Sequence, residues 1–397
     1  MRKGSFKNMK QLNKSNILSL IKDEEGISRA QIAEELGVSR ATVTNIVKEL
    51  INMKIVKESR EGESRGGRRP MLLDINAEGA FVIGFEWGID SLNAVLLNLE
   101  ADILAEDRVI VEDNSLSEYR DLTFALLAKF EELIKDSDRI IGVGLGIHGL
   151  VDPEKGVSLF TPHFNWGEIN IEDLLKNEIK YPLFVDNDVR MMAEGELWEG
   201  KDDFVFINTG AGIGAALVFD GKIRYGVSNS AGEFGHIKIT DTGPLCHCGK
   251  RGCLEALTSK DSILNNYLEK IREEKISEGL KEIEIEKELG LVNFAYLMEE
   301  YRKGDKLALE VVDQSLNYFA RGIADIVNLL NPGAVVIGGV FAEYADFILA
   351  DLKKMVSEIS LQLSASRLNI ESAYYGKQAG AVGAAEKVLN NFFSIPE

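Results

Sequence analysis

The chain is 397 residues long, which is more than a single hydrophobic core normally organises and therefore predicts two or three domains. Its 45% hydrophobic and 27% charged residues exclude a disordered or fibrous protein, and no apolar run approaches the ~18 residues of a membrane span, so we expect a cytoplasmic protein. The net charge of −19 hides a basic head, because residues 1–70 contain 15 Lys and Arg against 9 Asp and Glu, and this balance suits local attraction to DNA phosphates.

The first fifty residues have the pattern of three helices. Apolar residues recur at helical spacing from Asn8 to Glu25, and Gly26 ends that pattern. Ser28 can cap a second helix, which ends at Gly37, and Ser39 can cap a third. Two helices joined by a tight Gly-containing turn match the helix-turn-helix, whose second helix enters the major groove of DNA. The candidate DNA contacts on this helix are Ser39, Arg40, Thr42, Thr44, Asn45 and Lys48.

A loop rich in Arg and Gly follows the three helices. Two strand patterns, Ile55–Glu58 and Met71–Ile75, flank this loop, which is the order of elements in a winged helix-turn-helix. The candidate DNA contacts in the loop are Arg65, Arg68 and Arg69. The loop alone is equally compatible with insertion into the minor groove and with a flexible tether. An alternative for the whole head is a helical segment that packs against the body, with the charged loop as a solvated linker.

From Phe81 onwards the pattern changes to strands alternating with helices, which indicates α/β architecture. Ser259 to Leu330 is rich in Glu, Lys and Leu and is predicted to be helical, without a catalytic pattern. Glycine clusters follow two of the predicted strands, where backbone N–H groups can approach phosphates, although a tight turn needs glycine too. The predicted strands are Phe81–Phe85, Asn93–Leu99, Ile140–Ile147, Pro182–Val185, Phe204–Asn208, Ala215–Phe219 and Ala334–Ile337.

All three cysteines of the chain, Cys246, Cys248 and Cys253, lie within eight residues of one another. With His236 they form the spacing H-x9-C-x-C-x4-C. A tight, odd-numbered cluster indicates a metal site, and three thiolates with one imidazole are a closed tetrahedral set suited to structural zinc. His247 lies between two cysteines that must both point at the metal, so we expect it to face away. The alternative is a chance cluster of free thiols in a loop.

Acidic and amide side chains stand near this cluster and after one predicted strand. Glu233 precedes His236, Glu255 follows Cys253, and the pair Asn187 and Asp188 follows the strand that ends at Val185. A loop braced by metal presents its carboxylates rigidly to a cleft, where they can accept hydrogen bonds from sugar hydroxyls.

These motifs resemble those of the ROK family of repressors, open reading frames and sugar kinases. Ala231–His236 is similar to the family's Gly-Glu-x-Gly-His motif, and Cys246–Glu255 is similar to its C-x-C-G-x-x-G-C-x-E motif. The resemblance extends from about Phe81 to the C-terminus and, with the head, is to the family's xylose- and glucose-responsive repressors. It implies an α/β chain in which an N-terminal winged helix-turn-helix precedes a two-lobed, actin-like and hexokinase-like domain, with sugar bound between the lobes and homodimers or tetramers as the working form.

The resemblance also implies domain boundaries. The winged helix-turn-helix is expected at residues 1–62, and the wing and linker at 63–76. The first lobe is expected at 77–190, with a C-terminal helix, 377–397, returning to it. The second lobe, with the zinc loop, is expected at 191–376.

By motif position, the residues implied to contact the sugar are Asn187, Asp188, Glu233, His236 and Glu255, with His236 also holding zinc. In kinase members the position of Asp188 is the catalytic base that takes a proton from the attacking hydroxyl. This chain departs from the kinase pattern, since Glu86–Asp90 replaces an Asp-x-Gly-Gly-Thr-like loop and Ala211 removes the hydroxyl of a Gly-Thr-Gly loop. Anionic Asp90 facing ATP phosphates is unfavourable. We therefore predict that the base position is vestigial and that kinase activity is absent or very weak.

The sequence thus predicts a sugar-responsive transcriptional repressor of carbohydrate metabolism that binds a two-fold operator. One alternative is an active sugar kinase that uses ATP and Mg²⁺ on a hexose or N-acetylhexosamine and carries an added DNA-binding head. Another is a zinc-responsive regulator, although a closed site with three cysteines is poorly tuned to metal fluctuations. The identity of the sugar and the operator sequence stay open.

Overall fold

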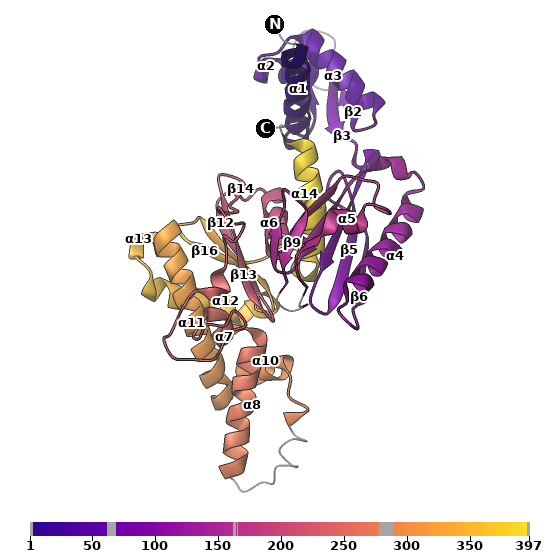
Figure 1. Ribbon diagram of the computed structural model, residues 1–397. Helices are drawn as coiled ribbons and strands as arrows, with labels where there is room; N and C mark the ends of the chain where they lie inside the picture. The colour runs from indigo at the N-terminus through magenta and orange to yellow at the C-terminus, as the bar shows by residue number, and fades with distance from the viewer. Residues whose placement is uncertain (1–2, 62–68, 162–163, 165, 278–288, 395–397) are drawn as a thin grey trace. The chain divides into compact units, whose positions relative to one another are not determined.

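The computed structural model divides into two compact units (Figure 1). The residues that it describes are 3–61, 69–161, 164, 166–277 and 289–394. The first unit consists of Met1–Trp198 together with Gly380–Glu397, and the second is Glu199–Ala379. The division falls at the end of one helix, α6 (Asp188–Trp198), which continues past residue 190, where the sequence analysis placed the lobe boundary.

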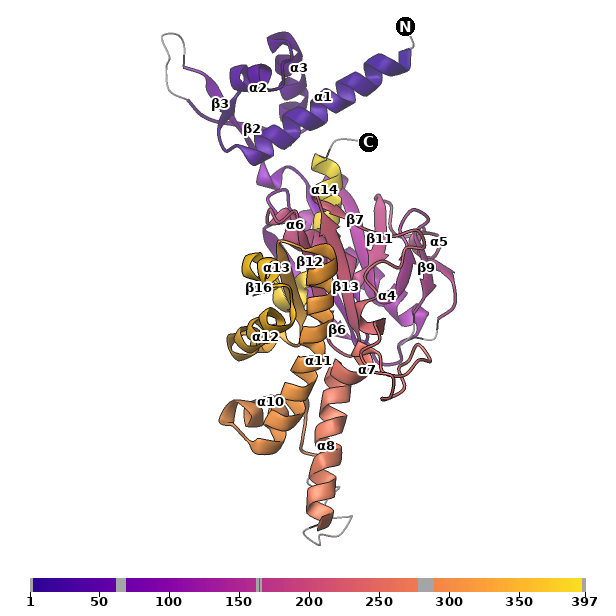
Figure 2. The same cartoon turned by 90° about the vertical axis from the view of Figure 1, so that its left-hand side faces the viewer.

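The head of the first unit has three helices and a small sheet, seen at the top of Figure 2. Its elements are α1 (Lys3–Asp23), β1 (Ile27–Ser28), α2 (Arg29–Glu35), α3 (Arg40–Asn52), β2 (Val56–Glu61) and β3 (Met71–Ile75). The predicted caps are present, because the side chains of Ser28 and Ser39 accept hydrogen bonds from the backbone N–H groups of Gln31 and Thr42. β3 pairs antiparallel with both β1 and β2, which confirms the predicted strands beside the wing loop.

The rest of the first unit is built on a five-stranded sheet of order β11-β7-β4-β5-β6. Its strands are β4 (Phe81–Trp87), β5 (Ser91–Asn98), β6 (Ile103–Ile110), β7 (Ile140–Ile147) and β11 (Leu183–Asn187). A small sheet of β8 (Leu150–Asp152), β9 (Val157–Phe160) and β10 (Ile169–Asn170) precedes the short helix α5 (Ile171–Leu175). Every residue of β4 and β5 is buried, as expected for strands covered on both faces.

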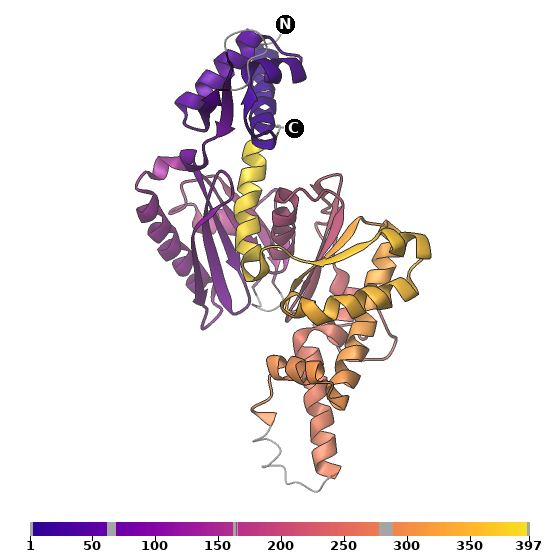
Figure 3. The ribbon, with the colours of Figure 1, turned by 180° about the vertical axis from the view of Figure 1, so that it is seen from behind.

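Helices cover both faces of this sheet, as Figure 3 shows. α4 (Leu116–Ile134) packs its apolar stripe against one face, with Phe130 fully buried in the core. On the other face, α14 (Ala379–Phe393) lies so close that a Cβ added to Gly84 or Gly144 would come within 2 Å of a carbonyl oxygen of α14. α6 is equally close to α14, since a Cβ on Gly383 would lie 1.8 Å from the carbonyl oxygen of Met191. Small residues on these surfaces therefore fix α14 between the sheet and α6.

The second unit has its own five-stranded sheet, of order β14-β13-β12-β15-β16. Its strands are β12 (Phe204–Thr209), β13 (Ile213–Phe219), β14 (Lys222–Ile223), β15 (Ala334–Gly339) and β16 (Asn369–Ser372). Its helices are α7 (Leu254–Thr258), α8 (Lys260–Ser277), α10 (Phe294–Lys303), α11 (Lys306–Leu330), α12 (Ala345–Ile359) and α13 (Gln362–Arg367). α11 supplies much of the buried core, including Phe319, so the segment from Ser259 to Leu330 is helical, as predicted, where it is described.

The two sheets repeat one topology. In each sheet the first strand is central, the second and third extend antiparallel to one side, and the fourth and fifth lie parallel on the other side. This duplicated arrangement matches the two-lobed, actin-like domain expected from the sequence. Among the described residues, no helix is long and apolar enough to cross a membrane.

Candidate functional site

The exposed face of α3 is the candidate surface for DNA. Arg40, Thr44, Asn45 and Lys48 are exposed, while the opposite side of the helix is buried in the head. Ser39 acts as the N-cap, and its hydroxyl lies 2.8 Å from that of half-buried Thr42, so both of these side chains are engaged in holding the start of the helix. The exposed side chains are thus presented by a rigid helix.

The wing is described only in part. Arg65 and Arg68 lie outside the described residues. Arg69 is exposed and its guanidinium is 3.7 Å from the carboxylate of Glu61 on β2. This pair is exposed to solvent, so a DNA phosphate could replace Glu61 as the partner of Arg69 at a small cost in free energy.

The second unit gathers the four predicted metal ligands. The donor atoms of His236, Cys246, Cys248 and Cys253 all lie within 4.8 Å of one another. Cys246 Sγ is 3.6 Å from His236 Nδ1, and Cys248 Sγ is 3.7 Å from Cys253 Sγ. Burial raises the pKa of the Cys246 thiol, and a bound cation would favour its thiolate form. The cluster can hold a metal ion, and its donors suit a soft ion with tetrahedral geometry.

Two predicted sugar contacts, Glu233 and Glu255, adjoin this cluster, and a third, His236, belongs to it. Glu233 Oε2 is 3.7 Å from His236 Nε2. Glu255 Oε1 is 3.5 Å from Cys246 Sγ, and its other oxygen accepts a hydrogen bond of 3.1 Å from the backbone N–H of Ile213. Each of the two carboxylates therefore contacts a residue of the His236 cluster, so the residues that could hold a metal ion also help to position Glu233 and Glu255.

The other two predicted sugar contacts stand in the first unit, where β11 meets α6. Asn187 Nδ2 donates to the carbonyl of Gly149 at 2.9 Å and to Asp188 Oδ1 at 2.7 Å, and the second oxygen of Asp188 is 3.3 Å from His148 Nδ1. His148 was not among the residues predicted from the sequence. The available signal was its place directly after the strand Ile140–Ile147, because residues that follow neighbouring parallel strands meet at one edge of a sheet.

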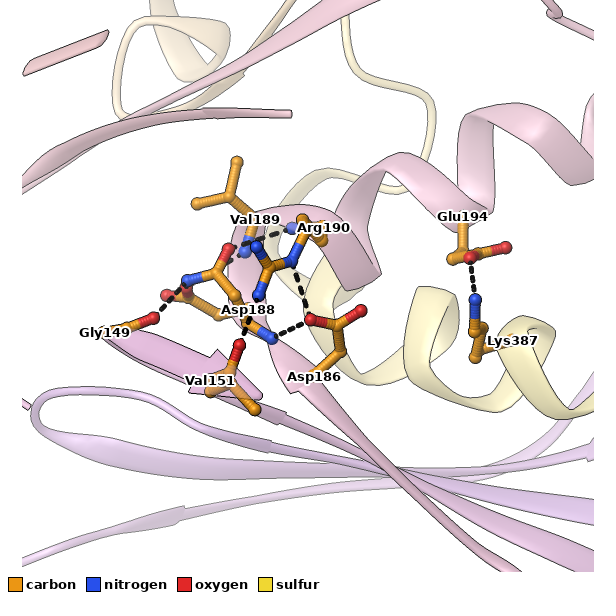
Figure 4. Close-up of polar contacts among 9 residues, drawn as sticks. Gly149, Val151, Asp186, Asp188, Val189, Arg190, Glu194 and Lys387 are labelled. Atoms are coloured by element: carbon orange, nitrogen blue, oxygen red, sulfur yellow. Dashed lines mark hydrogen bonds and ion pairs between the residues drawn. The ribbon is translucent and has the colours of Figure 1, made fainter. Parts of the chain in front are cut away.

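A buried ion pair supports this corner (Figure 4). Arg190 Nε lies 2.7 Å from Asp186 Oδ1, with side chains only 4% and 3% exposed, and Arg190 also donates to the carbonyl of Val151 at 3.1 Å. The two ionic residues flank the Asn187 and Asp188 pair in sequence. Losing either partner would leave a buried charge, at a cost of about 3–5 kcal/mol. The ion pair therefore fixes the position of the candidate sugar contacts.

Glu86, which stands where the kinase pattern has Asp, is buried beside α14. Asn93 Nδ2 donates to its carboxylate at 2.8 Å, and a Cβ added to Gly380 would lie 2.3 Å from Glu86 Cδ. Burial raises the pKa of Glu86 to about 7, the hydrogen bond from Asn93 opposes this rise, and the charge of Asp188 adds to it. The carboxyl group is thus packed against the first turn of a helix.

The second phosphate-loop candidate is a closed turn. The N–H of Gly210 donates to the carbonyl of Gly212 at 3.0 Å. The hydroxyl that precedes the loop, on Thr209, donates to the carbonyl of Gly338 at 2.7 Å and accepts from the N–H of Phe341 at 2.9 Å. This hydroxyl therefore links the ends of β12 and β15. Ala211, within the loop, has no hydroxyl that could contact a phosphate.

Replacing Glu86 by Gln should flatten the pH dependence of stability. The raised pKa means that the folded state holds the proton more tightly than the unfolded chain, so stability is highest below the ordinary Glu pKa and falls as pH rises through about 7. The wild type should lose about 2–3 kcal/mol of unfolding free energy between pH 5 and 8, at about 1.4 kcal/mol per pKa unit. Denaturant unfolding at several pH values measures this loss. The exposed Glu132→Gln change is the control, and an unaltered pH slope in Glu86→Gln would contradict the assignment.

Comparison with known proteins places the chain in a class. A model described as ROK family matches residues 82–390, and one described as winged helix-turn-helix DNA-binding matches residues 12–57. The chain belongs to the ROK family and carries a winged helix-turn-helix head. Its ROK part also has the fold of solved ROK sugar kinases and hexokinases.

Three similar proteins that align along most of the chain are named as regulators. The chain is 28% identical to the xylose repressor of Caldicellulosiruptor bescii, over 99% of each chain. It is also 28% identical to the DNA-binding transcriptional dual regulator NagC of Escherichia coli, over 92% of this chain and 90% of that protein. A solved ROK family transcriptional regulator, a homolog of the E. coli MLC protein, aligns with a TM-score of 0.81 at 26% identity and covers 96% of this chain and 97% of its own.

Proposed function

We propose that this protein is a sugar-responsive transcriptional repressor. The observation that carries the proposal is that one chain combines an exposed polar recognition helix with a ROK domain that retains the Asn187 and Asp188 pair. Relatives that align along nearly the whole chain, in Caldicellulosiruptor bescii and Bacillus subtilis, are named xylose repressors. Two copies of the head, in a homodimer or tetramer, bind a two-fold operator, because paired recognition helices must reach successive major grooves.

The sugar contacts that we propose are Asn187, Asp188, Glu233, His236 and Glu255. Their carboxylate, amide and imidazole groups suit the hydroxyls of a sugar, which both donate and accept hydrogen bonds. The buried ion pair of Arg190 and Asp186 supports the first two, and the metal cluster supports the other three. Polar groups held in fixed positions discriminate between sugars, because a sugar that lacks a matching hydroxyl leaves some of these groups without a hydrogen-bond partner.

We propose zinc as the ion of the His236 cluster. Three thiolates and one imidazole form a closed set with no position for substrate, which is typical of structural zinc. The ion would keep His236 next to Glu233 and Cys246 next to Glu255. Its role is therefore to hold the sugar-binding loop in shape, and sensing of zinc itself is the alternative.

The same site should have little or no kinase activity. A buried carboxyl at Glu86, the acidic Asp90 and the missing hydroxyl at Ala211 remove the groups that would cradle ATP phosphates in a kinase. A coupled assay with ATP, Mg²⁺ and a sugar panel tests this expectation. Turnover near or above about one per second, abolished by Asp188→Asn, would establish the rival kinase function.

The deciding experiment measures operator affinity with and without sugar. An operator is first selected from a randomised duplex library at moderate salt, and binding is then measured with D-xylose, D-glucose and N-acetylglucosamine. We expect one sugar to stabilise the protein in a thermal-shift assay and to change operator affinity by about fivefold or more. Failure to select any duplex would refute the repressor function, whereas selection without a response to any sugar would refute only the sensing function.

A further inference from the structure

α6 connects the proposed sugar site to the region where the head meets the body. It begins at Asp188 and ends at Trp198, so its 11 residues extend about 16 Å at ~1.5 Å per residue. Most of its residues are buried, so the helix is closely packed along its length.

α6 and α14 are joined along their length. The carboxylate of Glu194 on α6 is 6% exposed and accepts hydrogen bonds from Lys387 Nζ at 2.6 Å and Asn390 Nδ2 at 2.9 Å, both on α14 (Figure 4 shows the first). The backbones also touch where Gly383 meets Met191. Because the pair is charged, hydrogen-bonded and close-packed, the two helices should move as one body.

The far ends of these helices form a docking surface for α1 of the head. The rings of Trp198 and Phe393 lie 6.0 Å apart, and Lys22 Nζ is 3.4 Å from the centroid of Trp198 and 5.4 Å from that of Phe393. Ser19 Oγ donates to the carbonyl of Phe393 at 2.6 Å, and Ser15 Oγ donates to the carbonyl of Ser394 and lies 3.3 Å from that of Phe393. The last carbonyls of a helix lack partners within it, so α1 caps α14 with two hydroxyls and one cation.

A pocket lies in the same region. A cavity of about 430 Å³ lies beside the docking surface, lined by head residues such as Arg60 and Asp74 and by Leu99 and Trp198 of the body. Burial lowers the pKa of Lys22, which shows that its ammonium group is partly removed from water at the contact. Replacing Lys22 or Trp198 should therefore weaken this contact between α1 and the ends of α6 and α14.

We propose that the surface formed by Trp198 and Phe393 is the intramolecular docking site through which sugar binding changes the position of the DNA-binding head. Sugar bound at Asn187 and Asp188 displaces the start of α6, and α14 moves together with α6. The rings of Trp198 and Phe393, at the far ends of the two helices, then move relative to Lys22 and weaken or strengthen its contact with them. This inference rests on the proposed function. Sugar can shift the equilibrium between the docked and the released head only to the extent that it binds the two states with different affinities.

The test compares Trp198→Ala, Trp198→Phe and Lys22→Met with the wild type, and uses Asn391→Ala, an exposed position on α14, as the control. Limited proteolysis without sugar measures docking. We expect the protease to cleave the head from the body at least about fivefold faster in Trp198→Ala and Lys22→Met than in the wild type, because the contact opens more easily. The cleavage rate of Trp198→Phe should lie between those of these variants and the wild type. Equal release rates in all proteins would overturn the docking claim.

Operator affinity is then measured with whichever of D-xylose, D-glucose and N-acetylglucosamine stabilises the wild type. We expect Trp198→Ala and Lys22→Met to bind that sugar within about twofold of the wild type, while its effect on operator affinity falls below about twofold. Retention of the full operator response would overturn the proposal. If none of the sugars stabilises the wild type, the sensing function fails, and the proteolysis result still decides whether the head docks on Trp198.

Discussion

We expect the Cys253→Ser variant to purify with less than about a tenth of the zinc of the wild type, which should hold one ion per chain. Cys253 is buried and its sulfur contacts that of Cys248, so the smaller, harder oxygen leaves an incomplete site. Loss of the metal should cost several kcal/mol of unfolding free energy and so lower the melting temperature of the second unit by roughly 10 °C, at about 2–4 °C per kcal/mol. Metal analysis and calorimetry measure both effects.

The His247→Ala variant is the matched control for this loss. His247 lies in the same loop, between two ligands, but it is not among the four residues whose donor atoms converge. Its zinc content and melting temperature should match those of the wild type. Full zinc occupancy in Cys253→Ser, or a metal-free wild type, would contradict the assignment of the cluster.

Replacing both Arg40 and Asn45 by Ala should weaken specific operator binding by about a hundredfold or more, since each good contact to a base edge contributes about 1–3 kcal/mol. Both side chains project from the exposed face of α3. Affinity for unrelated duplex should change little, because phosphate contacts supply that binding. Lys48→Ala should instead weaken binding to both duplexes. The number of ions released on binding, measured from the salt dependence of the affinity, should fall by about one.

The control for α3 is Met53→Ala. Met53 is 49% exposed at the opposite end of the helix, so its removal tests for general damage to the head. Gel-shift or anisotropy titrations at two salt concentrations separate the outcomes. Equal loss on operator and unrelated DNA in the Arg40 and Asn45 variant would show that these residues contact only phosphates.

The sequence predicted the head and the metal cluster well because both are encoded by neighbouring residues. Ser28 and Ser39 cap their helices through atoms three residues away, and the cysteines of the cluster lie within one loop. Capping, turn and metal-ligand preferences act over such short distances, so a single sequence displays them.

Other features depend on distant parts of the chain and could not be predicted in this way. The strand Ile103–Ile110 was missed because its edge position exposes most of its charged residues and weakens the apolar pattern. The contact of Glu86 with Gly380 joins residues from opposite ends of the ROK domain. His148 gains its partner Asp188 only through the pairing of β7 with β11. The sugar contacts themselves followed from motif resemblance.

The fit of α14 against Gly84 and Gly144 has a consequence for biosynthesis. The sheet that needs this helix is translated before residue 190, whereas α14 leaves the ribosome only after the whole of Glu199–Ala379 has been made. Until then, the apolar face of the nascent sheet lacks its cover and is exposed to aggregation or to chaperones. The lobe that carries the DNA-binding head therefore completes its fold late, after the intervening unit has had time to form.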